Sequence, residues 1–502
     1  MKSSTSILIT AMVLTALALP AQLGAQHTRY QLVDLGTLGG PASYRSGFGD
    51  GETIVNERGF ATGIADTSIP DPNCSGCFYS HAFQSKNGVL SDLGTFPGGH
   101  YSYGNAINAS GWIAGSSDTA QFDPLTGSLA AHAALWKNSE MIDLGTLGTG
   151  LESATVYVTN GGEAVGYSTV DTVPDPFLYL GASPHPFIWK NGAMRDLGTL
   201  GGPDAMPTNG CDEQRGDLVA GWSLTNSTPN TTTGFPTQHA FVWENGTMVD
   251  IPTLGGTLAG AQCANNRGQV VGQSNLIGDS GCNGSTTSCD QHPFLWDHGA
   301  LVDLGALGGS YSVATWLNDA GEAVGGSSTA GDELFHATLW KDGAITDLGV
   351  LGDDCYSLAQ AVNSQHEIVG RSFSCDFSLL RAALWEKGTA IDLNTLIPAN
   401  SSLRLVEAVD ITDRGEIYGR GLPQDCGELD EDQCGHDFVL IPCEIAGTQN
   451  CQDNIGILSA IVQNNVVSIH RRTTAPQTRS ARKGSVPAWR RRLAARQFGS
   501  WN

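Results

Sequence analysis

The chain has 502 residues, a net charge of −24, 64 glycines and only 15% charged residues. This length allows several domains or one large repeat array. The acidic balance excludes a generally basic nucleic-acid-binding protein, so we expect no nucleic-acid partner. Residues 444–502 depart from this balance, because they hold nine Lys and Arg side chains against two acidic ones. We therefore predict a flexible, basic C-terminal tail over 444–502.

Residues 1–25 have the organisation of a secretory signal peptide. Lys2 precedes an apolar run over 7–19, and residues 23–25 form a small-residue cleavage site. The apolar run is too short to span a bilayer, and no later stretch is long and apolar enough to do so. We expect a secreted protein, extracellular or periplasmic, with no transmembrane segment in the mature chain.

A hairpin typified by residues 292–309 recurs along almost the whole chain. An apolar strand of the form His-Ala-Phe-x-Trp leads through a polar turn into a strand ending in Asp-Leu-Gly. The first strand begins, with variations, at His81, His132, His185, His239, His292, His336, Arg381 and His436. The Asp-Leu-Gly type of segment begins at Asp34, Asp92, Asp143, Asp196, Asp250, Asp303, Asp347 and Asp392. Self-similarity at steps of 44 to 58 residues indicates a repeat architecture.

Between successive hairpins lies an Asn-x-x-Gly turn flanked by two short apolar strands, as in 107–115, 265–272 and 317–325. Asn bonds its own backbone in such turns and Gly tolerates positive φ. Each unit thus supplies four strands: A before the Asn turn, B after it, C with His-Ala-Phe, and D with Asp-Leu-Gly. Four antiparallel strands per repeat are typical of a propeller blade, so the fold class is an all-β propeller.

The order of strands predicts how the ring closes. A lone D strand, residues 30–35, comes first, and the A, B and C strands of residues 405–441 come last. The first strand can complete the last blade. We predict eight blades over residues 26–443, closed by the N-terminal strand, with seven blades plus an extra unit as the alternative.

These motifs resemble the HAF family of extracellular repeats. HAF is intact at 81–83 and 239–241, and DLGTLGG is intact at 34–40 and 196–202. The resemblance covers residues 30–442 and rests on three motifs in a fixed order. It implies a secreted bacterial repeat protein and implies no chemistry.

Twelve cysteines in an exported chain predict structural disulfides. Their positions suggest mostly local pairs: Cys74–Cys77, Cys282–Cys289, Cys355–Cys375, Cys426–Cys434 and Cys443–Cys451, with Cys211–Cys263 between adjacent repeats. Metal binding is the alternative for the Cys-x-x-Cys of residues 74–77, but no second pair completes a zinc set. No cofactor is evident, and calcium remains a candidate ion.

Ser, His and Asp recur in the units and suggest a hydrolase triad at first sight. Catalysis needs one constellation at one place, whereas these residues return with the period of the blades. We expect them to form hydrogen bonds that lock each blade. The repeated Trp residues are expected in the core.

Function is therefore expected in segments that do not repeat. The B–C connections are long in the first five units and carry acids, so we predict an acidic working face where the B–C and D–A loops emerge. The candidate ligand-binding residues are Asp66, Asp118, Asp171, Trp222, Asp279 and Trp316. Such a face suits calcium, a cationic partner or a hydroxyl-rich glycan.

Three functions stay open. The first is a secreted binding or scaffold propeller for an extracellular ligand, a glycan or a protein. The second is a carbohydrate-active or other hydrolytic propeller that uses unrepeated loop carboxylates. The third is a structural surface-layer or matrix component. No catalytic residue is assigned, and enzymatic activity is the less favoured interpretation.

Overall fold

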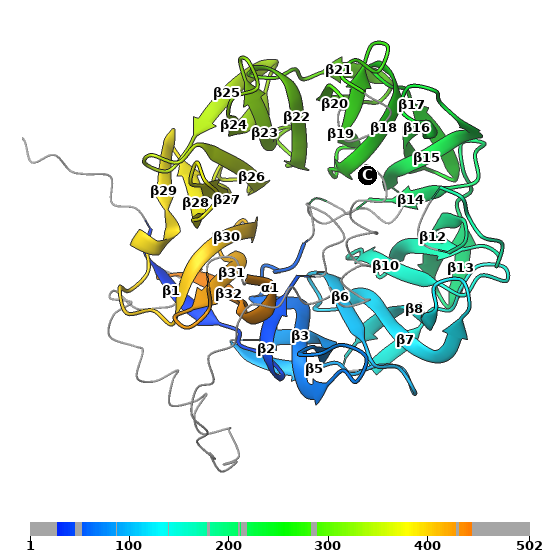
Figure 1. Cartoon of the computed structure of the whole chain (residues 1–502), viewed down its shortest axis with the longest axis horizontal. Helices are drawn as coiled ribbons and strands as arrows, with labels where there is room; N and C mark the ends of the chain where they lie inside the picture. The colour runs from blue at the N-terminus through cyan, green and yellow to red at the C-terminus, as the bar shows by residue number, and fades with distance from the viewer. Residues whose placement is uncertain are drawn as a thin grey trace, which may run out of the picture.

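The computed structural model describes residues 28–45, 53–86, 88–138, 140–177, 181–208, 211, 218–282, 289–427 and 431–443. These residues form blades of four antiparallel strands around one axis, as in a β-propeller (Figure 1). The predicted signal peptide, 1–25, and the predicted basic tail, 444–502, lie outside the described residues. In the described part, no helix is long and apolar enough to cross a membrane.

The first four blades follow in chain order. Blade 1 consists of β2 (Gly39–Tyr44), β3 (Phe60–Pro70), β4 (Phe78–Lys86) and β5 (Val89–Asp92). Blade 2 consists of β6 (Ser102–Ile107), β7 (Ile113–Asp123), β8 (Ser128–Lys137) and β9 (Glu140–Asp143). Blade 3 consists of β10 (Ser153–Val158), β11 (Ala164–Thr169), β12 (Pro184–Lys190) and β13 (Ala193–Asp196). Blade 4 consists of β14 (Ala205–Pro207), β15 (Leu218–Pro229), β16 (Pro236–Glu244) and β17 (Thr247–Ile251).

The next three blades repeat this order, and single parallel bridges connect blades 4 to 7. Blade 5 consists of β18 (Gly255–Ala264), β19 (Gln269–Leu276), β20 (Gln291–Asp297) and β21 (Ala300–Asp303). Blade 6 consists of β22 (Gly308–Leu317), β23 (Ala323–Thr329), β24 (Phe335–Lys341) and β25 (Ala344–Gly349). Blade 7 consists of β26 (Tyr356–Val362), β27 (Ile368–Phe373), β28 (Leu380–Glu386) and β29 (Thr389–Asp392), followed by the 3₁₀ turn η2 (Leu393–Thr395).

The eighth blade combines the two ends of the described chain. It consists of β30 (Leu403–Ile411), β31 (Ile417–Pro423), β32 (His436–Pro442) and β1 (Tyr30–Asp34), with the short helix α1 (Glu431–Cys434) before β32. Strand β1 pairs antiparallel with β32, from Tyr30 opposite Pro442 to Asp34 opposite Phe438. The prediction of eight blades closed by the N-terminal strand is therefore confirmed.

Repeated serines fasten each blade to the next. Ser153, in the A strand of blade 3, accepts a hydrogen bond from the Ala133 N–H and donates one to the Gly145 carbonyl, both in blade 2. In the B strand of the same blade, Ser168 accepts a hydrogen bond from the Leu147 N–H of the linker that enters the blade. Because these contacts return in other blades, their stabilisation accumulates around the ring.

The glycine that ends each B-strand motif is required by a close approach of backbones. The A strands carry a bulge, which brings a carbonyl over the neighbouring B strand. A Cβ on Gly272 would lie 2.2 Å from the Gly260 oxygen and 2.6 Å from the Phe294 ring. The repeated Phe of the C strand fills the space that the missing side chain leaves, and Phe294 is fully buried.

The long B–C connections are more regular than the sequence suggested. In blades 1, 2 and 4 the B and C strands continue outward as β-ribbons, with further pairing at Pro70–Phe78, Asp123–Ser128 and Pro229–Pro236. The extra length therefore forms hairpins attached to the blades. Several apolar side chains on these connections are exposed, including Ile69, Phe122 and Ile277.

Candidate functional site

The repeated histidines pair with the repeated aspartates. In seven blades, Nδ1 of the C-strand His lies 2.7–3.1 Å from the carboxylate of the D-strand Asp. In six of these pairs the Asp follows the His by 11 residues. In the seventh pair His436 contacts Asp34 across the closing β32–β1 junction. Burial raises the pKa of Asp92, but the hydrogen bond and charge of His81 and the Gly94 N–H outweigh it, so the pKa lies below its usual range.

Three of the repeated serines donate their hydroxyl protons to backbone carbonyl groups. Ser117 Oγ accepts a hydrogen bond from the Phe96 N–H and donates its proton to the Asp118 carbonyl. Ser168 and Ser274 donate in the same way to the next carbonyl along the strand. Since these hydroxyl protons are directed at backbone oxygens, the repeated residues serve blade assembly, as the sequence predicted.

The acidic candidates on the B–C side are mostly buried. Asp66 is 7% exposed and accepts hydrogen bonds from Tyr44 and Ser80. Asp118 is buried as well, and Asp279 accepts hydrogen bonds from the N–H and hydroxyl of Thr257. Asp171 is partly exposed and caps its own turn. None of these four lines the cavity described below, and their role in ligand binding stays a prediction.

The two tryptophan candidates lie in the core. Trp222 is buried against Leu224 and Met206, so it does not project from its loop. Trp316 is 1% exposed, so it is packed in the core and has almost no surface that could contact a ligand. It lies in the bulged part of β22, where the register shift turns it into the main apolar cluster.

An axial cavity of about 400 Å³ lies at the opposite end of the ring, among the A–B turns. Residues from seven blades line it, so it sits on the ring axis. The lining includes four acidic residues, Glu57, Asp319, Asp410 and Asp413, and among the described lining residues there is no Lys or Arg. The sequence placed the working face at the other end, because the long, unrepeated B–C connections emerge there.

The A–B turns form a hydrogen-bonded rim around this cavity. Asn108 Nδ2 donates to the Thr159 carbonyl of the next blade, and Asn318 Nδ2 donates to the Asn363 carbonyl. Asp413 Oδ1 accepts the Ser364 N–H at 2.8 Å. The rim is therefore cross-linked from one turn to the next by hydrogen bonds.

Asp410 holds the last blade to the first and lies in the cavity wall. Its Oδ2 accepts the N–H groups of Ile54 and Val55 at 2.9 and 3.2 Å. Burial raises the pKa of Asp410 to about 7, against the effect of these two hydrogen bonds, and the charge of Glu57 raises it further. Burial also raises the pKa of Glu57. A perturbed carboxyl group in a cavity is a candidate functional group.

A second polar cluster lies where blades 7, 8 and 1 meet. This charged seam comprises Arg45, Gln360, Arg371, Glu407, Arg420 and Asp437. Glu407 Oε1 lies 2.9 Å from Arg371 Nη1, 3.8 Å from Arg45 Nη2 and 3.4 Å from Gln360 Nε2. Burial raises the pKa of Glu407, but Arg371, Arg45 and Arg420 lower it more, so Glu407 is ionised.

Asp437 places a second carboxyl group in the seam. It occupies the Ala position of His-Ala-Phe, and its Oδ2 accepts the Tyr418 hydroxyl at 2.6 Å. Burial raises the pKa of Asp437 to about 6, although Arg420 and the Tyr418 hydrogen bond act in the opposite direction. The sequence carries a sign of this buried carboxyl group, because His-Asp-Phe replaces His-Ala-Phe at 436–438. A comparison of the charges at equivalent positions of the repeats would have revealed it.

Another carboxyl pair lies on the B–C side of blades 3 and 4. Asp204 is fully buried. Burial and the nearby Asp175 carboxylate raise its pKa to about 7. Asp175 and Asp204 both lie in connections that do not repeat. A hydrolytic propeller would need an unrepeated pair of carboxyl groups of this kind.

The disulfides follow the expected pattern. The structure contains Cys74–Cys77, Cys211–Cys263, Cys282–Cys289, Cys355–Cys375 and Cys426–Cys434. Cys443 is also disulfide-bonded, while its expected partner, Cys451, lies outside the described residues. Among the residues whose positions are described, no group of three or more His, Cys, Asp and Glu is arranged to hold a metal ion.

Comparison with known proteins yields structural similarity only. No family profile and no curated protein matches the chain. The β-propeller domain of the Trilobed protease from Pyrococcus furiosus is similar, with a TM-score of 0.40, 8% identity, and coverage of 73% of this chain and 98% of that one. The Pyrococcus horikoshii acylaminoacyl peptidase gives a TM-score of 0.38 and 11% identity over 79% of this chain and 58% of that one. TolB from Acinetobacter baumannii gives a TM-score of 0.30 and 11% identity, over 57% of this chain and 62% of that one. Similarity at this level carries no argument about activity.

Proposed function

We propose that this chain is an exported binding propeller that holds a small, positively charged ligand group in the axial cavity. Export is proposed from the signal-like residues 1–25 and from the resemblance to the HAF repeats. The cavity carries the proposal about binding. Its volume falls within the range of small-molecule sites, about 300–1,000 Å³.

The charge of the lining favours a cation. Four acidic residues and five asparagines line the cavity near the rim's backbone turns, and there is no Lys or Arg among the described lining residues. Asp410 retains a proton near neutral pH because its charge is poorly solvated. An ammonium group would supply both the missing positive charge and hydrogen-bond donors. A glycan could use the same acceptors but would gain nothing from the charge.

The test uses the mature protein, with spermidine and cadaverine as probes and xylitol as a neutral comparison. Binding is measured by calorimetry at pH 6 and pH 8. We expect the amines to bind more tightly at pH 8, because Asp410 is ionised there. Asp410→Asn keeps an acceptor for the Ile54 and Val55 N–H groups and should weaken amine binding at least about tenfold, the effect of losing roughly 1.4 kcal/mol.

Asp171→Asn is the matched control on the opposite face. It makes the same change of charge at a partly exposed candidate residue. Amine binding that survives Asp410→Asn but is lost in Asp171→Asn would move the site to the B–C face. Absence of amine binding to the folded wild-type protein would overturn the proposal.

A hydrolytic propeller is the second candidate, and the Asp175–Asp204 pair is the observation that favours it. A carboxylic acid with a pKa near 7 beside a second carboxylate suits general acid–base catalysis. Full burial of Asp204 weighs against direct contact with substrate. Hydrolysis of a glycoside or peptide probe that disappears in Asp204→Asn, with folding intact, would favour this alternative.

A further inference from the structure

The described chain ends beside the rim of the axial cavity. Strand β32 ends at Pro442, and a Cβ on Gly415 would lie 3.4 Å from Pro442 Cγ. Gly415 closes the A–B turn of blade 8, whose residues Thr412 and Asp413 line the cavity. Only β31 separates β32 from β30, whose end lies in the cavity wall. Since neighbouring strands lie about 4.8 Å apart, the C-terminal segment begins roughly 10 Å from that wall.

Residues 444–502 follow directly, and their charge is opposite to that of the cavity. They carry nine Lys and Arg side chains against two acidic ones, within a chain of net charge −24. Their densest cationic run is Arg490–Arg492. The chain between Cys443 and this run is long enough to reach the cavity, because each extended residue covers about 3.3 Å. Starting point, length and charge therefore all suit contact with the rim.

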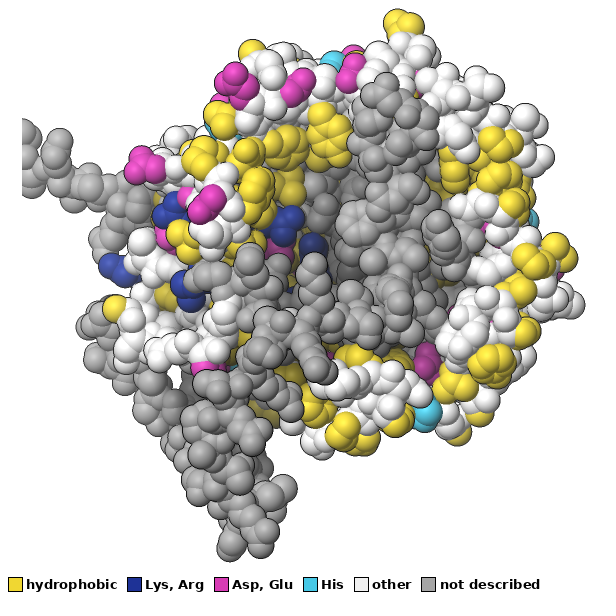
Figure 2. All heavy atoms as spheres, in the orientation of Figure 1, with side chains coloured by type: hydrophobic (Ala, Val, Ile, Leu, Met, Phe, Trp, Pro, Cys, Tyr) yellow, Lys and Arg dark blue, Asp and Glu magenta, His cyan; other side chains and the backbone are white. Residues whose placement is uncertain are grey.

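The described residues supply no cation to the lining of the cavity. Arg58, Arg267 and Arg414 belong to the turns around it, and each donates a hydrogen bond from Nη1 to a backbone carbonyl of the next turn. On the face shown in Figure 2, the Lys and Arg side chains gather over the elements of blades 7 and 8. A cation for the cavity therefore comes from outside the described residues.

Two acidic side chains of the lining have an oxygen atom to offer such a cation. Asp413 Oδ1 accepts the Ser364 N–H at 2.8 Å, and Glu57 Oε1 accepts the Asp413 N–H at 2.7 Å. The other carboxylate oxygen of each accepts no hydrogen bond from the described residues. Burial raises the pKa of Glu57, and the negative charges of Glu416 and Asp413 raise it further. A cation between these carboxylates would relieve their repulsion.

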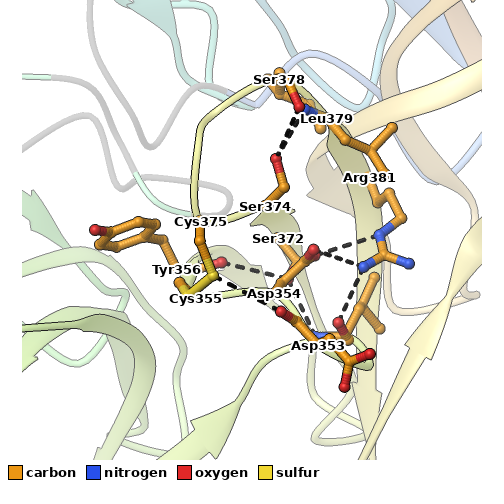
Figure 3. Close-up of polar contacts among 12 residues, drawn as sticks. Asp353, Asp354, Cys355, Tyr356, Ser372, Ser374, Cys375, Ser378, Leu379 and Arg381 are labelled. Atoms are coloured by element: carbon orange, nitrogen blue, oxygen red, sulfur yellow. Dashed lines mark hydrogen bonds and ion pairs between the residues drawn. A yellow bond between two sulfur atoms is a disulfide. The ribbon is translucent and has the colours of Figure 1, made fainter.

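Arg381 shows how this protein holds a guanidinium with such groups. Its Nη2 lies 2.6 Å from Asp354 Oδ1 and 3.0 Å from the Leu351 carbonyl, and its Nε contacts the same carboxylate (Figure 3). One carboxylate and one backbone carbonyl thus hold this partly buried arginine. The cavity offers carboxylate oxygens beside the backbone of the A–B turns, so it suits a guanidinium, which is always charged in proteins.

We propose that Arg490–Arg492 of the same chain dock at the acidic rim and place an arginine side chain in the axial cavity. The inference rests on the proposed function, because it names an internal occupant for the same cation site. The C-terminal segment then competes with an external amine. A tethered group has an effective concentration on the order of 1 mM, so a run that binds with a dissociation constant of about 0.1 mM weakens amine binding about tenfold.

The first experiment measures spermidine binding by the full mature chain with and without the docking run. The variant R490Q/R491Q/R492Q removes three charges and keeps the length of the chain. We expect its affinity for spermidine to be about tenfold higher than that of the wild type, because the internal competitor is lost. The difference should shrink at high salt, which screens the docking of exposed charges.

A matched control removes the same number of charges elsewhere in the C-terminal segment. R471Q/R472Q/R479Q should leave the affinity for spermidine close to the wild-type value. Both variants carry the same net charge, so a general electrostatic effect would move them equally. A shift in the control as large as that in R490Q/R491Q/R492Q would overturn the assignment to Arg490–Arg492.

The second experiment needs no external amine. A synthetic peptide of residues 486–496 is titrated into the R490Q/R491Q/R492Q protein, and we expect it to bind. Asp413→Asn in that protein keeps an acceptor for the Ser364 N–H and should weaken peptide binding several-fold. Asp171→Asn, on the opposite face, should leave it unchanged. Melting curves verify folding, and Glu57→Gln serves as the readout if Asp413→Asn does not fold.

The outcomes separate this inference from the proposed function. Equal spermidine affinity of wild type and R490Q/R491Q/R492Q would overturn the inference and leave the cation site standing. Failure of the peptide to bind would do the same. Peptide binding in a protein that binds no spermidine would support the internal occupant and overturn the proposal of a small external ligand. Peptide binding that is unchanged in the folded Asp413 and Glu57 variants would place the docking run outside the cavity and overturn the inference.

Discussion

The repeated aspartates of the outer strands and two buried aspartates of the ring closure behave in opposite ways. Asp92, Asp143, Asp196 and Asp303 lie on the outer strands and are about half exposed, and although burial raises their pKa values, the paired histidine and a backbone N–H outweigh it and hold them below the usual range. Asp410 and Asp437 lie in blade 8, are buried, and have pKa values of about 7 and 6. The repeat keeps its carboxylates where water can solvate them, whereas the closure places two carboxyl groups inside the protein, where burial favours the protonated form. Departures of this kind from local rules concentrate at functional sites.

The largest expected effect comes from opening the closure itself. Deletion of residues 28–36 removes β1, exposes the edge of β32 and removes Asp34, the partner of His436. We expect a loss of several kcal/mol of unfolding free energy, since a four-stranded blade loses its outer strand and buried Tyr30. Thermal and urea unfolding measure it. A deletion variant that melts like the full protein would show that the ring does not depend on this strand.

The second prediction compares the stability cost of removing a charge from the charged seam with the cost of removing one from the surface. Glu407→Gln leaves the three arginines of the seam without their shared carboxylate, which should cost about 3 kcal/mol, as expected when one partner of a buried ion cluster is removed. Glu333→Gln, at an exposed position of blade 6, should change stability by less than about 0.5 kcal/mol. Equal urea midpoints for the two variants would mean that the seam is solvated like the surface.

The sequence predicted the regular part of this comparison and missed the irregular part. The period, the turn chemistry and the order of strands were sufficient for eight blades, because every unit repeats them. The His–Asp and Ser contacts were predictable for the same reason. The A-strand bulge, which brings Gln360 to Glu407, leaves no mark in the apolar pattern. The axial cavity forms only when seven blades converge, so residues far apart in the chain create it.

The pH dependence of stability should show that the raised pKa values of Asp410 and Asp437 and the lowered pKa values of the repeated aspartates act in opposite directions. Asp410 and Asp437 keep a proton in the folded protein at pH values where the unfolded chain has lost it. Stability therefore falls as the pH rises from about 4 toward 7, by about 1.4 kcal/mol per pH unit for each such group. The lowered pKa values of Asp92, Asp143, Asp196 and Asp303 act in reverse, and their contribution is lost below about pH 4.

Asp410→Asn isolates one of these groups. The amide does not titrate but can still accept the Ile54 and Val55 N–H groups. The fall in unfolding free energy between pH 4.5 and 6.5 should therefore be about 2 kcal/mol smaller in the variant than in the wild type. Urea unfolding at several pH values measures the slope, and Asp171→Asn should keep the wild-type slope. An unchanged slope in Asp410→Asn would indicate an ordinary pKa for this group.

The smallest effect compares the same repeated histidine in two blades. His239→Ala removes the partner of Asp250, but that carboxylate is 51% exposed and water can replace the imidazole. The cost should be below about 1 kcal/mol, as for other exposed ion pairs. His436→Ala removes the partner of Asp34, whose side chain is only 27% exposed and lies on β1. It should cost more, about 1–2 kcal/mol, because it leaves a less solvated acceptor and loosens the closing strand. Neither change should alter amine binding. Equal losses in the two variants would mean that the closing blade is no more sensitive than the others, and the contrast between repeat and closure would then be confined to the buried carboxyl groups.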